Sequence, residues 1–247
     1  PRQIALLQAL NLEIPEFIHV ALFSGDDGAP LSKRNGSLSV KELREIGYFP
    51  QAVVNYLSRV GHTISDNELR NIYELSSVFN VSNISTSPSK IDHTQLNFWQ
   101  KNVIESLSIE ELSSWLESSL EDLPKEVNKD SFVGLIRDNI IFPSDAVRYL
   151  KNLFINPLDS EKEVEDLIKQ TGSHFFKIAE KIIENNWGNW SKTMKLIGEE
   201  TGTKGKSLFM PIRASITGQL SGPELDQVIE VMGLERVLRR LQEASTL

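Results

Sequence analysis

Short amphipathic helices account for most of the hydrophobic pattern of this chain, and several carry their own start and stop residues. Ser39 followed by Glu42 forms the pattern of a capping box, and Gly47 is placed to end that helix. Pro50 suits a first helical position, and Gly61 suits the end of the helix it opens. Similar helical patterns recur at 3–10, 65–79, 93–106, 109–120, 131–140, 144–152, 160–171 and 174–185, with three more helices expected in 189–247. No fixed repeat period is visible, so the sequence predicts an all-α fold.

One segment near the start has the composition of a β-strand. Residues 17–23 are rich in β-branched and aromatic side chains, and the turn Gly25-Asp26-Asp27-Gly28 follows them. A calcium site at this turn is excluded because the further oxygen ligands are missing. Residues 80–90 are rich in Ser and Asn and are expected to form a connection. We therefore expect at most a short strand beside the helices.

The charge of the chain is unevenly distributed. Hydrophobic residues make up 40% of the chain, and no apolar run approaches the roughly 20 residues needed to cross a bilayer. Between Glu105 and Gln170 there are 7 basic and 15 acidic residues, which accounts for the whole net charge of −8. The flanking parts are close to neutral, so contacts with phosphate groups are compatible with the acidic total.

Residues that usually bind metals are absent or scattered. The chain contains no Cys, which excludes disulfides and thiolate sites and fits a reducing compartment. Its 4 histidines show no ligand spacing: His19, His62, His93 and His174. We expect no metal site.

The run Gly202-Thr203-Lys204-Gly205-Lys206-Ser207 ends like a phosphate-binding loop. However, Glu200 stands where the first glycine is required, and a helix rather than a strand precedes the run. We expect the end of a helix at Gly202, joined to the next helix.

Residues further along the chain carry three more helix signals. Pro211 is tolerated in the first turn of a helix, Gly218 suits the end of a helix, and Ser221-Gly222-Pro223 are expected to start a further helix.

Two groups of large side chains have structural explanations. Trp187 and Trp190 are expected to pack in the core. Arg236, Arg239 and Arg240 are placed in the last turns of a terminal helix, where cations complement the dipole. A binding role for these arginines is an equal alternative.

A basic loop early in the chain is the strongest candidate for chemistry. Leu31-Ser32-Lys33-Arg34 lies between Pro30, which restrains the backbone, and Gly36, which frees it. The ammonium of Lys33 is a mobile point charge with three donors, which suits a phosphate whose position changes during a reaction.

Three blocks of sequence resemble the bacterial glutamate–tRNA ligases. The first runs from Pro1 to Gly61 and contains the basic loop, which is similar to the second nucleotide-binding signature (the KMSKS-type loop) of that family. The second runs from Val78 to Trp99, and the third runs from Trp190 to Leu241. Three ordered blocks at family spacing are more specific than any one motif.

The resemblance implies the all-α C-terminal half of such an enzyme, with only a short strand remnant of the catalytic domain. It implies a KMSKS-type loop with stem-contact helices over 1–105, and anticodon-binding helical subdomains over 106–158 and 159–247. By the same resemblance, Lys33 contacts ATP, whereas anticodon nucleotides are recognised at Arg213, Pro223 and Leu225. Enzymes of this family use ATP, with Mg²⁺, to convert glutamate to an adenylate and transfer it to tRNA-Glu. The family's first nucleotide signature and its glutamate pocket are missing, as is an initiator Met. We therefore expect a fragment that binds tRNA without catalysis of its own or a bound cofactor.

Two positions depart from the family pattern. Pro30 stands where many members carry the first lysine of the loop, which removes one cation. Asn139 stands where members that reject tRNA-Gln often carry an arginine, so the intact enzyme is hypothesised to accept tRNA-Gln as well.

Two other functions compete with this interpretation. One is an α-helical protein-interaction module whose acidic middle docks a basic partner. The other is an independent nucleotide-binding enzyme, which rests only on Lys33 and the imperfect phosphate loop. The preferred interpretation predicts a cytoplasmic monomer that binds no membrane.

Overall fold

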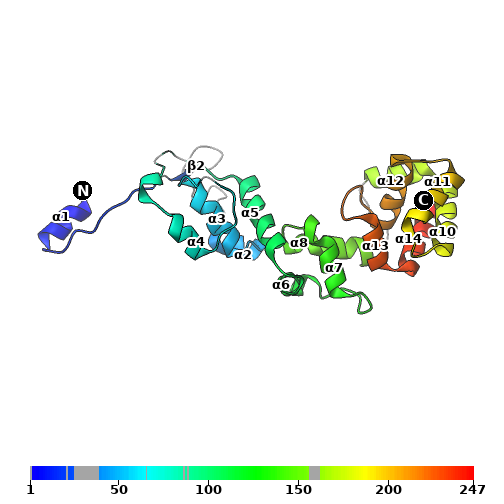
Figure 1. Ribbon diagram of the computed structural model, residues 1–247, viewed down its shortest axis with the longest axis horizontal. Helices are drawn as coiled ribbons and strands as arrows, with labels where there is room; N and C mark the ends of the chain where they lie inside the picture. The colour runs from blue at the N-terminus through cyan, green and yellow to red at the C-terminus, as the bar shows by residue number, and fades with distance from the viewer. Residues whose placement is uncertain are drawn as a thin grey trace. The chain divides into compact units, whose positions relative to one another are not determined.

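The structure is a computed structural model that describes residues 2–20, 22–24, 39–64, 66–85, 87, 89–155 and 162–247. Within these ranges the chain forms fourteen α-helices and one two-stranded sheet, so the predicted all-α class is confirmed. The chain divides into two compact units, Pro1–Gln100 and Lys101–Leu247, and Figure 1 labels most of their elements.

Local start and stop signals set the helices of the first unit. Its elements are α1 (Arg2–Ala9), β1 (Phe23–Ser24), α2 (Val40–Ile46), α3 (Pro50–Val60), α4 (Ile72–Val78), a 3-10 turn (Val81–Asn83), β2 (Ser89–Lys90) and most of α5 (His93–Ser106). At the start of α2 the Glu42 N–H donates to Ser39 Oγ at 3.2 Å, which completes the predicted capping box. Gly47 ends α2 with a φ of +107°, in the left-handed region that favours glycine.

The predicted strand at 17–23 is wrong in its extent. Residues 12–20 have no regular structure, and only Phe23 and Ser24 pair, in parallel with Ser89 and Lys90. A β-rich composition needs a neighbouring strand to hydrogen-bond with, and among the described residues only these two positions find one.

The predicted helix at 65–79 is shorter in the structure, because tertiary hydrogen bonds hold the chain before Asn71 in another conformation. The fully buried Asn55 of α3 donates from Nδ2 to the Arg70 carbonyl at 2.7 Å and accepts from the Arg70 N–H at 3.1 Å. Asn71 then caps α4 by accepting from the Glu74 N–H at 3.1 Å.

Polar contacts complete the core of the first unit. The Arg59 guanidinium lies 4.1 Å from the centroid of the buried Trp99 ring, and its Nη1 donates to Asn55 Oδ1 at 3.0 Å. The fully buried Gln100 donates to the Gly47 carbonyl at 3.1 Å and accepts from the Phe49 N–H at 2.9 Å. These contacts tie α5 to the ends of α2 and α3.

The second unit is a set of short helices around an apolar core. Its elements are α6 (Ile109–Trp115), α7 (Lys129–Ile136), α8 (Pro143–Leu150), α9 (Lys162–Thr171), α10 (Ser173–Asn185), α11 (Trp190–Thr201), α12 (Lys206–Thr217), α13 (Leu225–Met232) and α14 (Leu234–Thr246), with 3-10 turns at Glu117–Ser119 and Arg137–Asn139 and a π turn at Lys151–Ile155. The boundary predicted at 158/159 lies outside the described residues.

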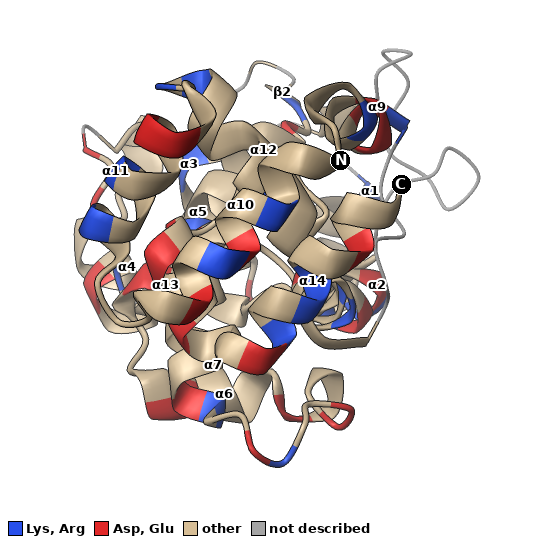
Figure 2. Ribbon diagram, turned by 90° about the vertical axis from the view of Figure 1, so that its right-hand side faces the viewer, with Lys and Arg blue, Asp and Glu red and all other residues tan. Residues whose placement is uncertain are grey.

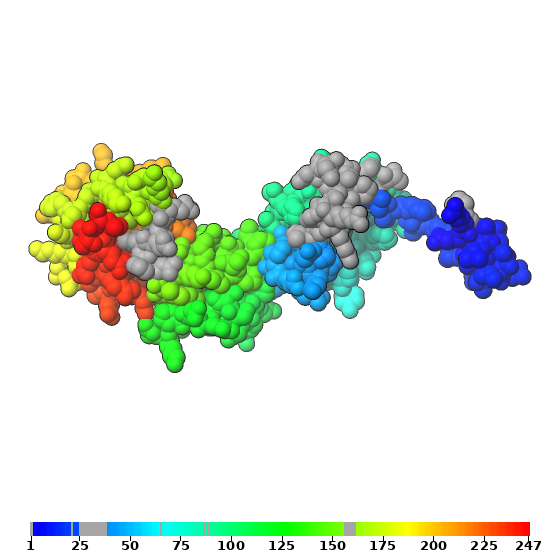
Figure 3. Space-filling view, turned by 180° about the vertical axis from the view of Figure 1, so that it is seen from behind, coloured from blue at the N-terminus to red at the C-terminus, as the bar shows by residue number. Residues whose placement is uncertain are grey.

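Helices α10 and α14 pack along one another, and Figure 3 shows α14 in red beside α10 in yellow-green. The buried residues of α10 include Phe176 and Ile183, and those of α14 include Val237 and Leu241. Their exposed faces carry both acidic and basic residues, which Figure 2 shows in red and blue.

The expectation of three helices in 189–247 is wrong, since the structure has four. Gly233 adopts a φ of +80° and both ends α13 and precedes α14. A residue with a side chain would favour continuation of one helix through this point. Gly202 does end α11 as predicted, with a φ of +68°.

The terminal arginines do not lie in the last turns of a helix as predicted, because α14 continues to Thr246. Arg240 is only 3% exposed, and its Nη2 donates to the Asn152 carbonyl at 2.7 Å. Arg236 forms an ion pair with Glu126 and lies 5.4 Å from the centroid of the Phe154 ring. Both side chains therefore make tertiary contacts within the second unit.

The expectation that Trp187 and Trp190 pack in the core is also wrong. Trp187 is 40% exposed and Trp190 is half-buried. Gly188, with a φ of +86°, turns the chain between α10 and α11 and leaves both rings at the surface.

Candidate nucleic-acid interface

The residues predicted to contact ATP and those predicted to contact tRNA differ in how far the structure describes them. Leu31, Ser32, Lys33 and Arg34 lie outside the described residues. Arg213, Pro223 and Leu225 all lie in the second unit, on α12 and on the segment that leads into α13.

Arg213 emerges from a tightly packed stretch of α12. Ile212 and Ala214 on either side of it are fully buried, whereas Arg213 itself is half-buried. Its Nη1 atom is shielded from solvent and has no hydrogen-bond partner. A buried donor without an acceptor costs about 1–3 kcal/mol, so an acceptor supplied by a ligand would be stabilised here.

Pro211 lies inside α12, and not in its first turn as predicted, because the helix already begins at Lys206. Proline removes one backbone donor from the helix interior. Gly218 ends α12 with a φ of +67°, as expected.

The turn after α12 is held by one threonine hydroxyl. Thr217 Oγ1 donates to the Arg213 carbonyl at 2.8 Å, and the Gln219 N–H donates back to Thr217 Oγ1 at 3.1 Å. The chain therefore leaves α12 in a fixed direction beside Arg213.

Gly222 brings this turn close to α8. Its φ of +138° is in the region that favours glycine. A Cβ added there would lie 3.5 Å from Tyr149 Oη and 3.6 Å from Gln219 Oε1. The backbone at Gly222 thus borders a phenol and an amide.

Pro223 and Leu225 differ from Arg213 because their side chains are buried. Pro223 lies two residues before α13 and does not start that helix, which is a correction to the expected position. The two side chains anchor the segment, so a ligand at this place would meet mainly its backbone. Their part in recognition stays a prediction.

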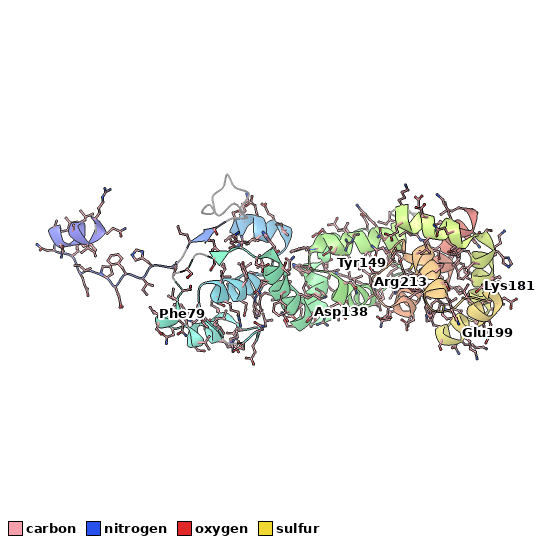
Figure 4. All side chains as sticks on the ribbon, turned by 90° about the horizontal axis from the view of Figure 1, so that it is seen from above. Phe79, Asp138, Tyr149, Lys181, Glu199 and Arg213 are labelled. Carbon is pink, nitrogen blue, oxygen red and sulfur yellow. The ribbon has the colours of Figure 1, made fainter. Side chains whose placement is uncertain are left out.

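Tyr149 is the residue of this region that the sequence did not reveal. Burial raises the pKa of its phenol, while the positive charges of Arg148 and Arg213 act in the opposite direction. Figure 4 labels Tyr149, which lies on α8, and Arg213, which lies on α12. Tyr149 is one of the buried residues on the apolar face of α8, and no local signal in the sequence distinguishes it from an ordinary core residue.

Asn139 lies in the 3-10 turn after α7 and is half-buried. Its neighbour Arg137 is used structurally: Nη2 donates to the Leu107 carbonyl at 2.9 Å and also to the Glu105 carbonyl. Arg137 therefore fixes the turn that presents Asn139.

The imperfect phosphate loop has the predicted form of a helix end and a helix start. Gly205 adopts a φ of +57°, and Ser207 Oγ donates to the Lys204 carbonyl at 2.8 Å. Lys206 and Ser207 instead border a cavity of about 1190 Å³ whose walls also carry Glu163, Asp166 and Glu200. These three carboxylates outnumber the two ammonium groups of the cavity, Lys162 and Lys206, so its charge does not favour a triphosphate.

Two kinds of feature are absent from the described part of the chain. No group of three or more His, Asp or Glu side chains there is arranged to hold a metal ion. None of the helices described is both long and hydrophobic enough to cross a bilayer.

Comparison with known proteins assigns the family. The family described as "Anticodon binding domain" matches residues 108–245, which is more than half of the chain. The chain belongs to the anticodon-binding-domain family. Residues 1–98 match the family described as "tRNA synthetases class I (E and Q), catalytic domain".

Relatives of known sequence confirm the resemblance to glutamate–tRNA ligases. Glutamate–tRNA ligase 1 of Halorhodospira halophila is 41% identical over 247 residues, which cover 100% of this chain and 51% of that protein. Glutamate–tRNA ligase 2 of Nitrosococcus oceani is 38% identical, over 98% of this chain and 51% of that protein. The chain spans about half the length of these relatives.

Solved structures show the same fold. The glutamate tRNA ligase of Elizabethkingia meningosepticum superimposes with a TM-score of 0.82 at 20% identity, covering 99% of this chain and 54% of that one. The glutamate-tRNA synthetase of Elizabethkingia anophelis gives a TM-score of 0.80. The alternative of a protein-interaction module finds no support in these comparisons.

Proposed function

We propose that this chain is the tRNA-binding half of a glutamate–tRNA ligase, and that an anticodon base contacts Arg213. One observation carries the proposal: in a member of the anticodon-binding family, Arg213 keeps a shielded guanidinium N–H without an acceptor. The edges of unpaired bases offer carbonyl oxygens and ring nitrogens as acceptors. Arginine presents its donors in a rigid fork, which suits such an edge.

The segment around Gly222 and Pro223 is proposed to form the second wall of this site. Its backbone is held between the Thr217 turn and Tyr149, so its own N–H and C=O groups have fixed directions. Leu225 stabilises the wall from inside the core.

The whole enzyme is proposed to activate glutamate with ATP, with Mg²⁺ as the usual companion of ATP, and to transfer the acyl group to tRNA-Glu. In this scheme Lys33 lies at the triphosphate, where its charge offsets the charge that builds up as pyrophosphate leaves. The present chain alone is proposed to bind tRNA without aminoacylating it. We further propose the domain limits 1–105, 106–158 and 159–247, a monomeric state and a cytoplasmic location.

Titration of labelled tRNA-Glu with the purified chain, at low and moderate salt, tests the central proposal. We expect saturable binding that weakens with salt, and Arg213→Ala should weaken it about tenfold, because one base contact is worth about 1–3 kcal/mol. Lys181→Ala is the control, since Lys181 is an exposed basic residue of the same unit. Equal affinity of the Arg213→Ala and Lys181→Ala variants would refute the role of Arg213.

The role of Lys33 is tested in a protein that joins this chain to the catalytic half found in the relatives. Lys33→Ala should slow ATP–pyrophosphate exchange by orders of magnitude, about the effect of removing one preorganised charge from a transition state. An unchanged exchange rate would contradict the ATP contact without affecting the tRNA proposal.

Acceptance of tRNA-Gln is a separate hypothesis that rests on Asn139. The joined protein should charge both tRNA-Glu and tRNA-Gln, and Asn139→Arg should reduce charging of tRNA-Gln selectively. Strict refusal of tRNA-Gln by the unaltered protein would end this hypothesis.

A further inference from the structure

A cavity of about 400 Å³ opens where the turn between α10 and α11 meets α13. Its walls combine the rings of Trp187 and Trp190 with the carboxylates of Asp226 and Glu230. It is separate from the Arg213 site, because none of its lining residues belongs to α8, α12 or the 218–224 segment.

The two tryptophans are available to a ligand. Trp187 is the most exposed large hydrophobic residue of its turn, at 40%, and Trp190 is half-buried. Neither indole N–H donates to another described residue. The floor between them is apolar and comes from Ile183 and Ile229.

The carboxylates are also uncommitted. Asp226 and Glu230 are four residues apart on α13, so they lie on the same face of the helix. Both are exposed, and within the described ranges neither forms an ion pair. Asp226 Oδ1 accepts only the neighbouring Gln227 N–H, at 2.9 Å.

The polar side chains at the back of the cavity are already satisfied. Thr193 Oγ1 donates to the carbonyls of Asn186 and Asn189, and Asn186 Nδ2 donates to the Ile182 carbonyl at 2.9 Å. These polar side chains define the shape of the cavity. The groups left to contact a ligand are the tryptophan rings and the carboxylates.

No Lys, Arg or His lines this cavity, so its lining charge is negative. A phosphate group would be repelled by both carboxylates, which disfavours a nucleotide. A cation is favoured by two interactions: a cation–π interaction with the faces of the indole rings, and charge-assisted hydrogen bonds to the carboxylates.

We infer that this cavity is a binding site for an alkylammonium group, with the aliphatic part of the ligand on Trp187 and Trp190 and the ammonium on Asp226 and Glu230. The group can belong to a free aliphatic amine or to a lysine side chain of a protein. A four-carbon diamine is the natural probe, since its two ammonium ends can meet the two carboxylates and its methylenes can cover the rings.

Titration of the 247-residue chain with 1,4-diaminobutane, followed by tryptophan fluorescence and by calorimetry, tests the site. We expect saturable binding that is absent with 1-butanol, which has a similar size and no charge. Asp226→Asn and Glu230→Gln should each weaken binding about tenfold, and Trp187→Ala should do so as well. Glu199→Gln is the matched control, because Glu199 is an exposed acid of the same unit that does not line the cavity.

Two further ligands are titrated in the same way. A lysine-rich peptide represents a protein partner, and cytidine represents a nucleic-acid base without a phosphate. Binding of the diamine alone identifies a free amine as the ligand class, and binding of the peptide alone identifies a protein partner. The proposal is overturned if neither amine binds, if cytidine binds in their place, or if Glu199→Gln weakens binding as much as Glu230→Gln. Circular dichroism of each variant separates loss of binding from loss of folding.

Discussion

The two units of the molecule differ in how many of their hydrophobic residues are buried. Of the 40 buried hydrophobic residues in the described chain, 34 lie in the second unit, from Val103 to Ala244. Of the 22 exposed large hydrophobic residues, 18 lie in the first unit, from Ile4 to Phe98. The second unit therefore buries its own core, whereas the first relies on polar contacts around Asn55 and Gln100.

This difference indicates that the second unit is the one stabilised by its own hydrophobic core. Burial of apolar area is the main favourable term in folding, and the second unit has most of it. Four substitutions, described from the largest expected effect to the smallest, test the contrast.

Phe176→Ala should have the largest effect. The ring is fully buried in α10, so the substitution should lower the free energy of unfolding of the second unit by about 3–5 kcal/mol. Urea unfolding, with hydrogen exchange to assign each transition, measures it. Tyr73→Ala in the first unit, where the ring is 82% exposed, is the control and should change stability by at most about 0.5 kcal/mol. A similar loss in both variants would contradict the contrast.

Asn55→Ala should destabilise the first unit by about 2–3 kcal/mol, because it leaves the Arg70 N–H without its acceptor and leaves the Arg70 carbonyl with only the longer bond of 3.4 Å from Gln51. The same urea and hydrogen-exchange experiment reports the result. If the first unit were held mainly by hydrophobic burial, as the second is, the loss would stay below about 1 kcal/mol.

Asp66 makes the stability of the first unit depend on pH. Its hydrogen bonds with Arg70 lower the pKa of the Asp66 carboxyl from 3.8 to about 2. The folded state thus holds its proton less tightly than the unfolded state, so this stabilisation is present above pH 4 and disappears as the pH falls through about 2. Asp66→Asn should lower the free energy of unfolding at pH 7, and its difference from the unaltered protein should vanish only below pH 2. A constant difference across this range would show that the charge is not responsible.

Lys195→Ala should have the smallest effect. Lys195 and Glu199 form an exposed ion pair of 3.8 Å on α11, and such pairs contribute about 0–1 kcal/mol. Thermal unfolding at two salt concentrations should show no more than a small shift. A large shift would mean that surface charge, and not the core, stabilises the second unit.

Helices with local start and stop signals were predictable from the sequence. Ser39, Gly47, Gly202 and Gly218 act through their own backbone or through neighbours three residues away, so their effects can be inferred without knowledge of the fold. Gly233 carries a similar signal, in the range 189–247 for which only three helices were predicted.

Features that depend on distant contacts were not predictable. The irregular chain before Asn71 depends on Asn55, and the positions of Arg236 and Arg240 depend on Glu126 and Asn152. In the candidate site, Arg213 was found through resemblance to a family. Tyr149 was not found, because its electrostatic interaction with Arg213 is between two helices that are far apart in sequence.

The left-handed backbone of Gly222, packed against Tyr149, has a consequence for how this surface can evolve. Contacts made by main-chain groups do not depend on which side chains stand nearby, provided the path of the chain is kept. A saturation mutagenesis experiment should therefore tolerate other apolar residues at Leu225 yet accept almost nothing except glycine at position 222. Natural variation would then accumulate around this point while its shape is preserved.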